Sequence, residues 1–576
     1  MKRRLPPAIG AALIVTLLAA CTGVNAGPRV APEASLSAPA GTVSATTLAP
    51  SSTSSEASSS AATPGSESPA TEPDNAAPQN PNGVPGVPTN EDDVAAAIDQ
   101  IDDLAQEAFN ETGIPGMAVA VVHDGEVVFA KGYGVREVGK PDKVDADTVF
   151  QLASVSKSIG ATVIAKEVGD GVVTWDTPVI AHLPTLALSD PYVTQNVTIA
   201  DMYSHRSGLP GHAGDRLEDL GYDQAQIFER MKLLPLNPFR AVYNYTNFGM
   251  TMGAESVAAA AGTDWPTLSD QAIYEPLGMS ATSSRFSDFQ AAPNHASGHV
   301  LVDGGYQAKY VRDPDAQTPA GGVSASVTDV ATWLAMVLNE GKAADGTQVV
   351  DPEALRAALT PVIRSVDGSP VPNDSALRAG FYGYGVGVGN DSTGRVRLSH
   401  SGAFYQGTGT TYLAIPNLDL GIVVLTNATA NGTAEGVANS FADVAEFGTE
   451  QIDWLAGYRA ALSGVDDPAG ELAGQTPPAN PTPAAPNAAF VGTYQNDFWG
   501  PVTITESGSE LVLTAGPNYQ QFPLTHWDGS IFTMVPTGEN APDGSVSEVS
   551  FELSGDTASA LTVEFWNQEN LGTFRR

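Results

Sequence analysis

The chain has 576 residues, of which 27 are Lys or Arg and 65 are Asp or Glu, so its formal net charge is −38 at pH 7. This excess of negative charge repels nucleic acid phosphates and anionic membrane surfaces, which argues against a nucleic-acid partner. The length allows two or more folded units of roughly 100 to 200 residues each.

Residues 1–21 have the pattern of an export signal. Three basic residues at positions 2–4 precede an almost wholly apolar run over 8–20. That run is shorter than the roughly 20 residues of a membrane-spanning helix. Cys21, the single cysteine, follows it directly, so no disulfide can form within the chain. The pattern resembles a bacterial lipoprotein signal, which implies a lipid anchor at Cys21 on the extracytoplasmic face of the cell membrane. An ordinary signal peptide is the alternative.

Residues 22–91 are mainly Ala, Ser, Thr, Pro and Gly, and they include no aromatic residue. Such a segment buries too little apolar area to offset its ordering entropy, so it is predicted to be disordered. As a flexible coil its residues would span roughly 45 Å root-mean-square. We therefore expect a tether that holds the folded part away from the membrane.

Residues 92–465 combine helical and strand patterns. Apolar residues at helical spacing predict a helix near the start, over 92–109. An Asp-Gly turn at 124–125 joins two apolar runs, which predicts a hairpin over 114–134. Four later strand patterns lie at 382–388, 396–399, 409–415 and 420–426. Helices in the middle and strands from both ends predict a mixed α and β domain whose sheet joins distant segments.

Glycines alternate with larger residues over 383–389. We interpret them as part of the strand predicted over 382–388, because their spacing follows the strand period and does not form a dinucleotide-binding loop.

A Pro-rich linker at 466–488 separates this domain from a final one at 489–576. Eight short strand-like runs lie in the final domain, at 493–494, 502–504, 511–513, 522–524, 531–534, 549–551, 561–563 and 572–574. Regularly spaced short strands predict a small barrel or sandwich. Its aromatic residues are expected to pack the interior, with a ligand cup as the alternative.

The pattern S-x-x-K at Ser154 and Lys157 follows a predicted strand and opens a predicted helix. Residues three apart share one face of a helix, so the lysine amine can lie beside the serine hydroxyl and take its proton. A helix-capping serine and a solvated surface lysine are the structural alternative.

Two further motifs supply groups that such a nucleophile needs. Y-x-N at Tyr245 and Asn247 offers a second proton-handling hydroxyl and an amide that can bind substrate. Tyr243 competes for the role of the polar tyrosine. H-x-G at His400 and Gly402 offers a glycine beside which another backbone can approach closely. A purely structural histidine is the alternative at position 400.

The order of these motifs resembles the serine beta-lactamase and penicillin-binding-protein superfamily, and within it the class C-like branch of D-aminopeptidases, DD-carboxypeptidases and esterases. Supporting phrases lie at 149–154, 204–210, 275–279 and 319–323. The resemblance implies an α+β fold, with an antiparallel sheet flanked by helices and an all-helical region. The final domain resembles the lipocalin-like barrel often appended to these hydrolases.

The same resemblance implies a role for each motif residue. The implied catalytic residues are Ser154, Lys157, Tyr245 and His400, and the implied substrate-binding residues are Asn247, Gly402 and Ala403. The backbone N–H groups of Ser154 and Ala403 would form the oxyanion hole, with no metal or cofactor. True class C beta-lactamases have a lysine where this chain has His400, which would be a weaker and pH-dependent cation. We therefore expect peptidase, amidase or esterase activity more than efficient beta-lactam hydrolysis.

The resulting hypothesis is an extracytoplasmic serine hydrolase that cleaves an amide or ester through an acyl-serine intermediate. Its expected substrates are small peptides, esters or beta-lactams. The alternative is a binding or sensor protein that captures penicillin or a cell-wall peptide without turnover.

Overall fold

A computed structural model describes residues 86–88, 90–365 and 380–576. The predicted export signal, Cys21 and almost all of the expected tether lie outside the described residues. Within them, no helix combines the length and apolar character that crossing a membrane would require.

The first domain starts with the helix and hairpin that the sequence predicts. Helix α1 (Glu91–Thr112) begins where the Asn90 side chain accepts a hydrogen bond from the Asp92 amide, and it ends at Gly113, whose φ is 63°. Strands β1 (Gly116–His123) and β2 (Glu126–Gly134) follow as an antiparallel pair. Both predictions are therefore confirmed.

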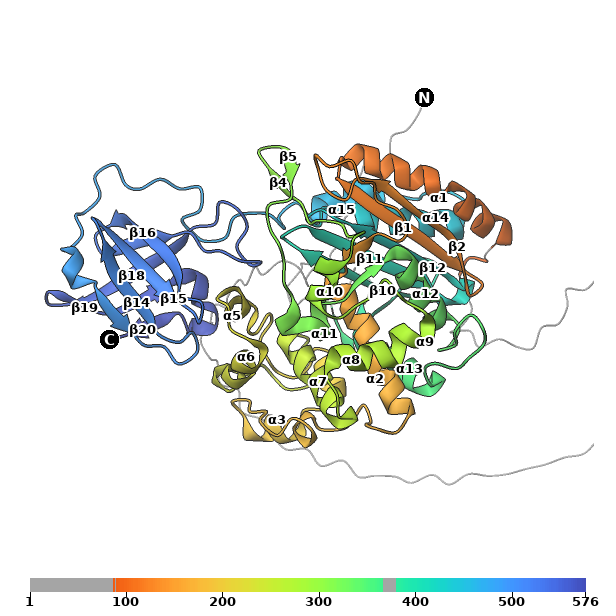
Figure 1. Cartoon of the computed structure of the whole chain (residues 1–576), viewed down its shortest axis with the longest axis horizontal. Helices are drawn as coiled ribbons and strands as arrows, with labels where there is room; N and C mark the ends of the chain where they lie inside the picture. Colours follow the sequence, from red (N-terminus) through yellow and green to blue (C-terminus); the bar gives the residue numbers. More distant parts are fainter. Residues whose placement is uncertain (1–85, 89, 366–379) are drawn as a thin grey trace, which may run out of the picture. The chain divides into compact units, whose positions relative to one another are not determined.

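The main sheet has eight strands in the order β2-β1-β12-β11-β10-β9-β8-β7. The six later strands are β7 (Ile363–Arg364), β8 (Phe381–Tyr382), β9 (Gly387–Asn390), β10 (Val396–Phe404), β11 (Thr408–Ile415) and β12 (Leu420–Thr426). Strand β1 pairs with β12 in antiparallel register, Met117 lying opposite Thr426. The sheet thus joins the two ends of the domain, as the sequence predicts (Figure 1).

Each face of this sheet has its own apolar core, because β1 points alternate side chains to opposite faces. Val119 and Val121 pack with α1 and α14 (Thr433–Phe447). Ala118 and Ala120 belong to the other core, with α2 (Ser156–Gly169) and α12 (Val327–Leu338). Helix α2 is therefore buried against the sheet, which positions the S-x-x-K motif inside the domain.

Most of the remaining helices belong to the region between β2 and β7. They are α3 (Pro191–Asn196), α4 (Ile199–Tyr203), α5 (Asp215–Asp219), α6 (Gln224–Arg230), α7 (Asn247–Ala261), α8 (Trp265–Ser269), α9 (Glu275–Leu277), α10 (Phe286–Ala291), α11 (Thr318–Gly321) and α13 (Pro352–Ala358), with α15 (Trp454–Ala461) near the domain's end. Two small sheets interrupt them, β3 (Val149–Gln151) with β6 (Ser324–Ser326) and β4 (Val300–Val302) with β5 (Gly305–Gln307). The domain is α+β with an extensive helical region, as expected.

The strand predicted over 382–388 is wrong, because a turn divides it. Strand β8 ends at Tyr382, the Gly383 amide donates to the Val386 carbonyl at 2.8 Å, and β9 begins at Gly387. Gly385 has a φ of 70°, and a Cβ there would lie 2.5 Å from the carbonyl oxygen of Lys157. The glycine at 385 thus serves a tight turn against α2 and has no strand role.

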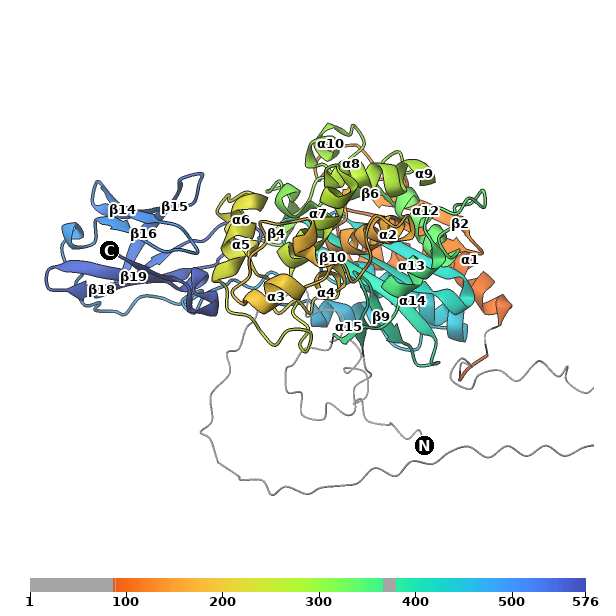
Figure 2. The ribbon, with the colours of Figure 1, turned by 90° about the horizontal axis from the view of Figure 1, so that it is seen from below.

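The second domain is a nearly closed antiparallel barrel whose eight strands follow one another in sequence order. They are β13 (Gly492–Tyr494), β14 (Val502–Ser507), β15 (Glu510–Ala515), β16 (Gln520–Asp528), β17 (Ile531–Met534), β18 (Ser547–Ser554), β19 (Thr557–Val563) and β20 (Thr573–Arg575). Gln495 and Arg575 exchange two backbone hydrogen bonds of 2.7 and 3.0 Å, which link the first and last strands. In Figure 2, β14 to β16 form one wall and β18 and β19 the other. All eight predicted strands are present.

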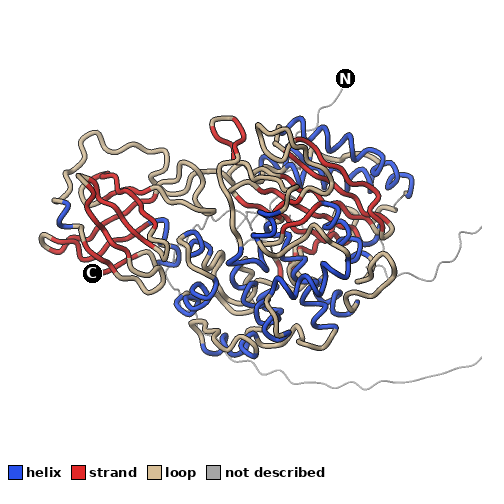
Figure 3. Tube along the Cα trace, viewed as in Figure 1, coloured by secondary structure: helices blue, strands red, loops and turns tan. Residues whose placement is uncertain are grey.

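Aromatic side chains fill the interior of the barrel. The rings of Trp499 and Trp566 stack at 5.9 Å, and Phe490 lies 4.8 Å from Phe551. These side chains are buried in the apolar core, so packing is the role that the structure shows for them. Figure 3 shows the strands in two main groups, with most helices around the first.

The Pro-rich segment at 466–488 runs along the barrel. The Val546 amide donates to the Ala469 carbonyl at 2.9 Å, and the Gly529 amide donates to the Thr482 carbonyl at 2.8 Å.

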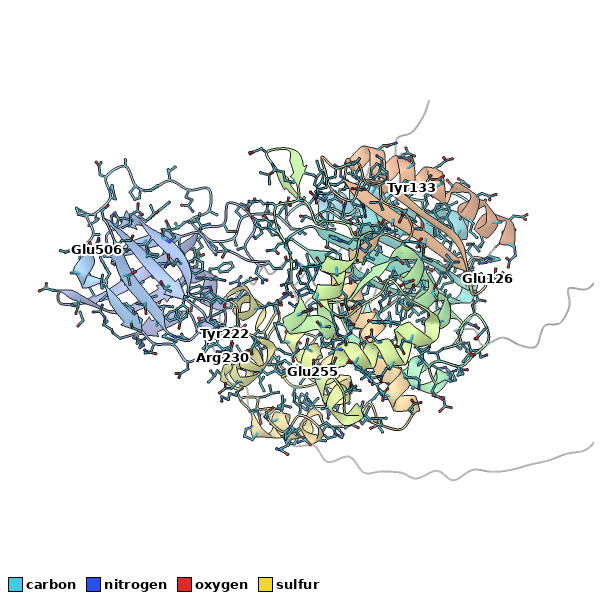
Figure 4. The ribbon with its side chains drawn as sticks, viewed as in Figure 1. Glu126, Tyr133, Tyr222, Arg230, Glu255 and Glu506 are labelled. Carbon is cyan, nitrogen blue, oxygen red and sulfur yellow. The ribbon has the colours of Figure 1, made fainter. Side chains whose placement is uncertain are left out.

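Helices α5 and α6 of the first domain border the barrel: the Tyr222 hydroxyl donates to the Trp499 carbonyl at 2.7 Å, and Arg230 donates to the Phe498 carbonyl at 3.0 Å (Figure 4).

Candidate active site

Ser154 lies in a short 3-10 turn (Ala153–Val155) between β3 and α2. Ala153 has a φ of 46°, a left-handed conformation that a residue with a side chain rarely adopts. Ala153 and Val155 are buried, whereas Ser154 is partly exposed. The strained turn therefore presents the serine hydroxyl at the end of an otherwise buried segment.

Lys157 is 0 % exposed, so the interpretation of a solvated surface lysine is wrong. Its Nζ donates to Ser154 Oγ at 3.0 Å, to Asn247 Oδ1 at 2.8 Å and to the Ala320 carbonyl at 2.7 Å. An ammonium has three donors, and a buried one needs partners for them. The lysine is thus held beside the serine by neighbours on α7 and α11.

Tyr245 donates its hydroxyl hydrogen to Ser154 Oγ at 2.7 Å. Lys157 Nζ lies 4.6 Å from the centre of the same ring, so the cation faces the negative face of the phenol. Of the two candidate tyrosines, Tyr245 is the one that contacts the serine. Tyr243 packs instead against the rings of His205 and Tyr382, at 5.5 and 5.6 Å.

His205 supports the tyrosine motif from within the core. Its Nδ1 accepts a hydrogen bond from the Thr246 amide at 3.2 Å, and its ring lies 4.5 Å from that of Tyr245. Burial lowers the pKa of His205 well below its ordinary value, so the ring is neutral.

Asn247 begins α7 and is held from two sides. Its amide oxygen accepts from Lys157, and its amide nitrogen donates to Asp215 Oδ2 at 2.9 Å. The same Asp215 oxygen lies 3.0 Å from His212 Nδ1. Sequence reasoning missed Asp215, because it is 32 residues from its partner and belongs to no local pattern.

His400 lies on β10 with both ring nitrogens engaged. Nδ1 is 2.7 Å from the Ser401 carbonyl, which can only accept, so Nδ1 carries the proton and Nε2 accepts from the Tyr382 hydroxyl at 2.8 Å. Burial, reinforced by the charge of Lys157, lowers the pKa of His400 to about 3. The expectation of a pH-dependent cation near neutral pH is therefore wrong, because the ring is neutral and fully hydrogen-bonded.

Gly402 brings the backbone of β10 against the nucleophile. A Cβ at this position would lie 2.9 Å from the Ser154 amide nitrogen and would also collide with the Leu152 carbonyl oxygen. Only glycine allows this approach. Ala403 follows directly on the same strand, opposite Gly409 of β11.

In the part of the chain that the structure describes, no group of three or more His, Cys, Asp or Glu side chains could hold a metal ion.

A sheet domain in which a serine receives hydrogen bonds from a buried lysine and a tyrosine has the architecture of a serine hydrolase. The Beta-lactamase family model matches residues 95–446, and a second model, Domain of unknown function (DUF3471), matches residues 476–573. The chain belongs to the serine beta-lactamase and penicillin-binding-protein superfamily, and is a serine hydrolase of that superfamily.

Three relatives match between 42% and 82% of this chain at low identity. Unguisins hydrolase ungD of Aspergillus violaceofuscus (strain CBS 115571) is 26% identical, over 82% of this chain and 88% of the relative. Penicillin-binding protein 4 of Amycolatopsis lactamdurans is 29% identical, over 69% of this chain and 98% of the relative. The D-alanyl-D-alanine-carboxypeptidase/endopeptidase AmpH of Escherichia coli (strain K12) is 25% identical, over 42% of this chain and 62% of the relative.

The fold also has a solved counterpart. The octameric penicillin-binding protein homologue from Pyrococcus abyssi aligns with a TM-score of 0.53 and 19% identity, over 81% of this chain and 98% of that structure. At this identity the comparison supports the fold alone.

Proposed function

We propose that the protein hydrolyses an amide or ester bond through an acyl-enzyme intermediate on Ser154. The observation that carries the proposal is the double contact of Ser154 Oγ, which receives hydrogen bonds from both Lys157 and Tyr245. These two groups can stabilise the negative charge that develops on the oxygen, and the one of them that has first lost its own proton can remove the serine proton.

In the first step one member of the Lys157 and Tyr245 pair is deprotonated. Oγ bonds to the substrate carbonyl carbon while the serine proton passes to that member. The carbonyl oxygen becomes negative, and the backbone N–H groups of Ser154 and Ala403 stabilise it. Each donor of this kind typically contributes ~10² to 10³ in kcat. The leaving amine or alcohol departs with a proton from the same pair. Water then attacks the acyl group, gives up its proton to the pair and releases the acid, with the proton returning to Oγ.

The surroundings of the nucleophile support a proposal for the substrate class. His400 is neutral and its nitrogens are engaged with Tyr382 and Ser401, so it offers no charge to a substrate carboxylate. We therefore favour small peptides and esters over efficient turnover of beta-lactams.

The test is labelling with a fluorophosphonate probe combined with a panel of D-amino acid peptides, short-chain esters and a chromogenic cephalosporin. We expect wild-type protein to be labelled and to release product steadily, and S154A to show neither. Labelling that persists in S154A would refute the nucleophile. One equivalent of acylation without further turnover would identify a binding protein instead.

We also propose export and a lipid anchor at Cys21, supported by the sequence pattern of residues 1–21. Expression in a bacterial host should place the full-length protein in the membrane fraction, and C21S should shift it to the soluble fraction. Equal membrane association of both proteins would contradict the anchor.

A further inference from the structure

One loop of the barrel touches two sides of the catalytic domain. Residues 538–543, called the clamp loop below, lie between β17 and β18. Its residues contact the end of α5 on one side and the segment directly after β10 on the other. Asp543 of the same loop also pairs with Lys309. Both segments belong to the framework of the candidate active site, because α5 begins with Asp215 and β10 carries Gly402 and Ala403.

The α5 side is held by Asp219. Its Oδ1 accepts a hydrogen bond from the Glu539 amide at 2.8 Å. Its Oδ2 accepts from the Asn540 amide at 3.1 Å and from the Asn540 side chain at 2.8 Å. Asp219 is one helical turn beyond Asp215, the residue that orients Asn247. A carboxylate of the catalytic domain thus binds the backbone of the clamp loop.

The β10 side is held by the reverse arrangement. The Glu539 carboxylate accepts hydrogen bonds from the amides of Tyr405 and Gln406, the latter at 3.2 Å. These amides follow Phe404, the last residue of β10. The Tyr405 hydroxyl also accepts from the Asp543 amide at 2.7 Å. A carboxylate of the barrel therefore binds the backbone of the strand that passes Ser154.

A buried arginine interacts electrostatically with both of these carboxyl groups. Arg312 pairs with Glu218 at 2.6 Å, and both side chains are 8 % exposed. Its guanidinium lies 5.1 Å from the ring centre of Phe404. Burial raises the pKa of Glu539 to about 8, and the charge of Arg312 opposes this rise. Both oxygens of Glu539 and both oxygens of Asp219 accept backbone hydrogen bonds. A buried polar group that loses its partner is costly, so the two carboxyl groups are suited to fix the segments that they bind.

We propose that Asp219 and Glu539 form a clamp through which the barrel fixes β10 relative to α5, and that Glu539 is a positioning residue for the hydrolysis proposed above. Loss of the clamp would let the end of β10 shift, and with it the Ala403 amide expected in the oxyanion hole. Small displacements of such groups are costly in rate. The inference rests on the proposed function, but the clamp itself can be measured without catalysis.

The experiment compares wild-type protein with E539Q, D219N and the control E506Q. Glu506 is an exposed barrel carboxylate on β14 that contacts Asn487 (Figure 4). Two quantities are measured on each folded protein: the second-order rate constant for fluorophosphonate labelling, and hydrogen exchange of a peptide that contains the Tyr405 and Gln406 amides.

We expect E539Q to exchange faster at these amides and to be labelled about tenfold more slowly. The loss is moderate because the Ala403 amide on β10 would be displaced but would still be present. E506Q should match wild type in both measurements. D219N leaves Glu539 in place and should show the same two changes, which decides the matter if E539Q does not fold.

Unchanged exchange in both clamp variants would overturn the clamp. Faster exchange with unchanged labelling would overturn the positioning role and leave a contact that only joins the domains. Failure of wild-type protein to react with the probe would refute the proposed function, whereas the exchange data would still decide whether the clamp exists.

Discussion

The carboxylate of Asp215 lies 2.9 Å from the amide nitrogen of Asn247, and this contact determines which end of the amide faces the active site. A carboxylate accepts only, so it holds the NH₂ group and turns the amide oxygen toward Lys157. D215L removes the acceptor, and we expect kcat/KM to fall about tenfold because the amide can then rotate. D215N keeps an acceptor and should retain most activity. Equal activity of D215L and wild type would contradict the role.

Tyr245 and its neighbour Tyr243 provide a matched pair. Y245F keeps the ring beside Lys157 but removes the hydrogen bond to Ser154. We expect labelling and turnover to fall about 100-fold, the usual effect of losing a general acid or base. Y243F should change both by less than about threefold, because its ring packing is retained. A larger loss in Y243F than in Y245F would reverse the assignment.

Lys157 can be tested against a lysine on the same helix. K157M replaces a buried ammonium by an apolar chain of similar length, so turnover should fall at least roughly 100-fold. The free energy of unfolding should stay similar or rise, because no charge is then buried. K166M is the control, since Lys166 lies on the surface of α2 beside Asp170. Urea denaturation and labelling separate the two quantities, and a K157M protein that is active would exclude Lys157 from catalysis.

The neutral state of His400 predicts a pH effect on stability. Its pKa is about 3 in the folded protein and near 6.5 in an unfolded chain. Between these values the unfolded chain binds a proton that the folded protein does not, so the free energy of unfolding falls as pH falls from 6.5 toward 3. The contribution is at most about 1.4 kcal/mol per pH unit.

H400Q removes this ionisation and keeps an acceptor for Tyr382. Urea denaturation at pH 4.5, 5.5, 6.5 and 7.5 should therefore show a weaker pH dependence for H400Q than for wild type. Parallel curves would mean that His400 does not titrate differently on folding.

The sequence predicted the parts of the site that depend on local geometry. Ser154 and Lys157 are three residues apart, and the spacing of a helical turn already brings them together. The eight barrel strands were equally predictable, because short apolar runs and turns alternate there. The broken strand shows the limit of this reasoning: Gly385 belongs to an alternating pattern, yet its φ of 70° places it in a turn.

The missed features depend on contacts between distant segments. Asp219 and Glu539 are 320 residues apart and carry no shared motif. His400 is neutral because it is buried and bonded to Tyr382, and its own motif specifies neither its burial nor this partner. Periodicity reports which face of an element is buried, but not which polar group on another element will meet it.

The pairing of β1 with β12 has a consequence for biosynthesis. Met117 finds its partner Thr426 only after roughly three hundred more residues have been made. Contacts between residues so far apart in sequence form slowly. Until β12 has been made, the apolar strand β1 exposes an unpaired edge that can pair with other chains. In a nascent or truncated chain that stops before β12, the hairpin would therefore be a site of aggregation. The chain needs protection from aggregation until nearly the whole first domain has been synthesised.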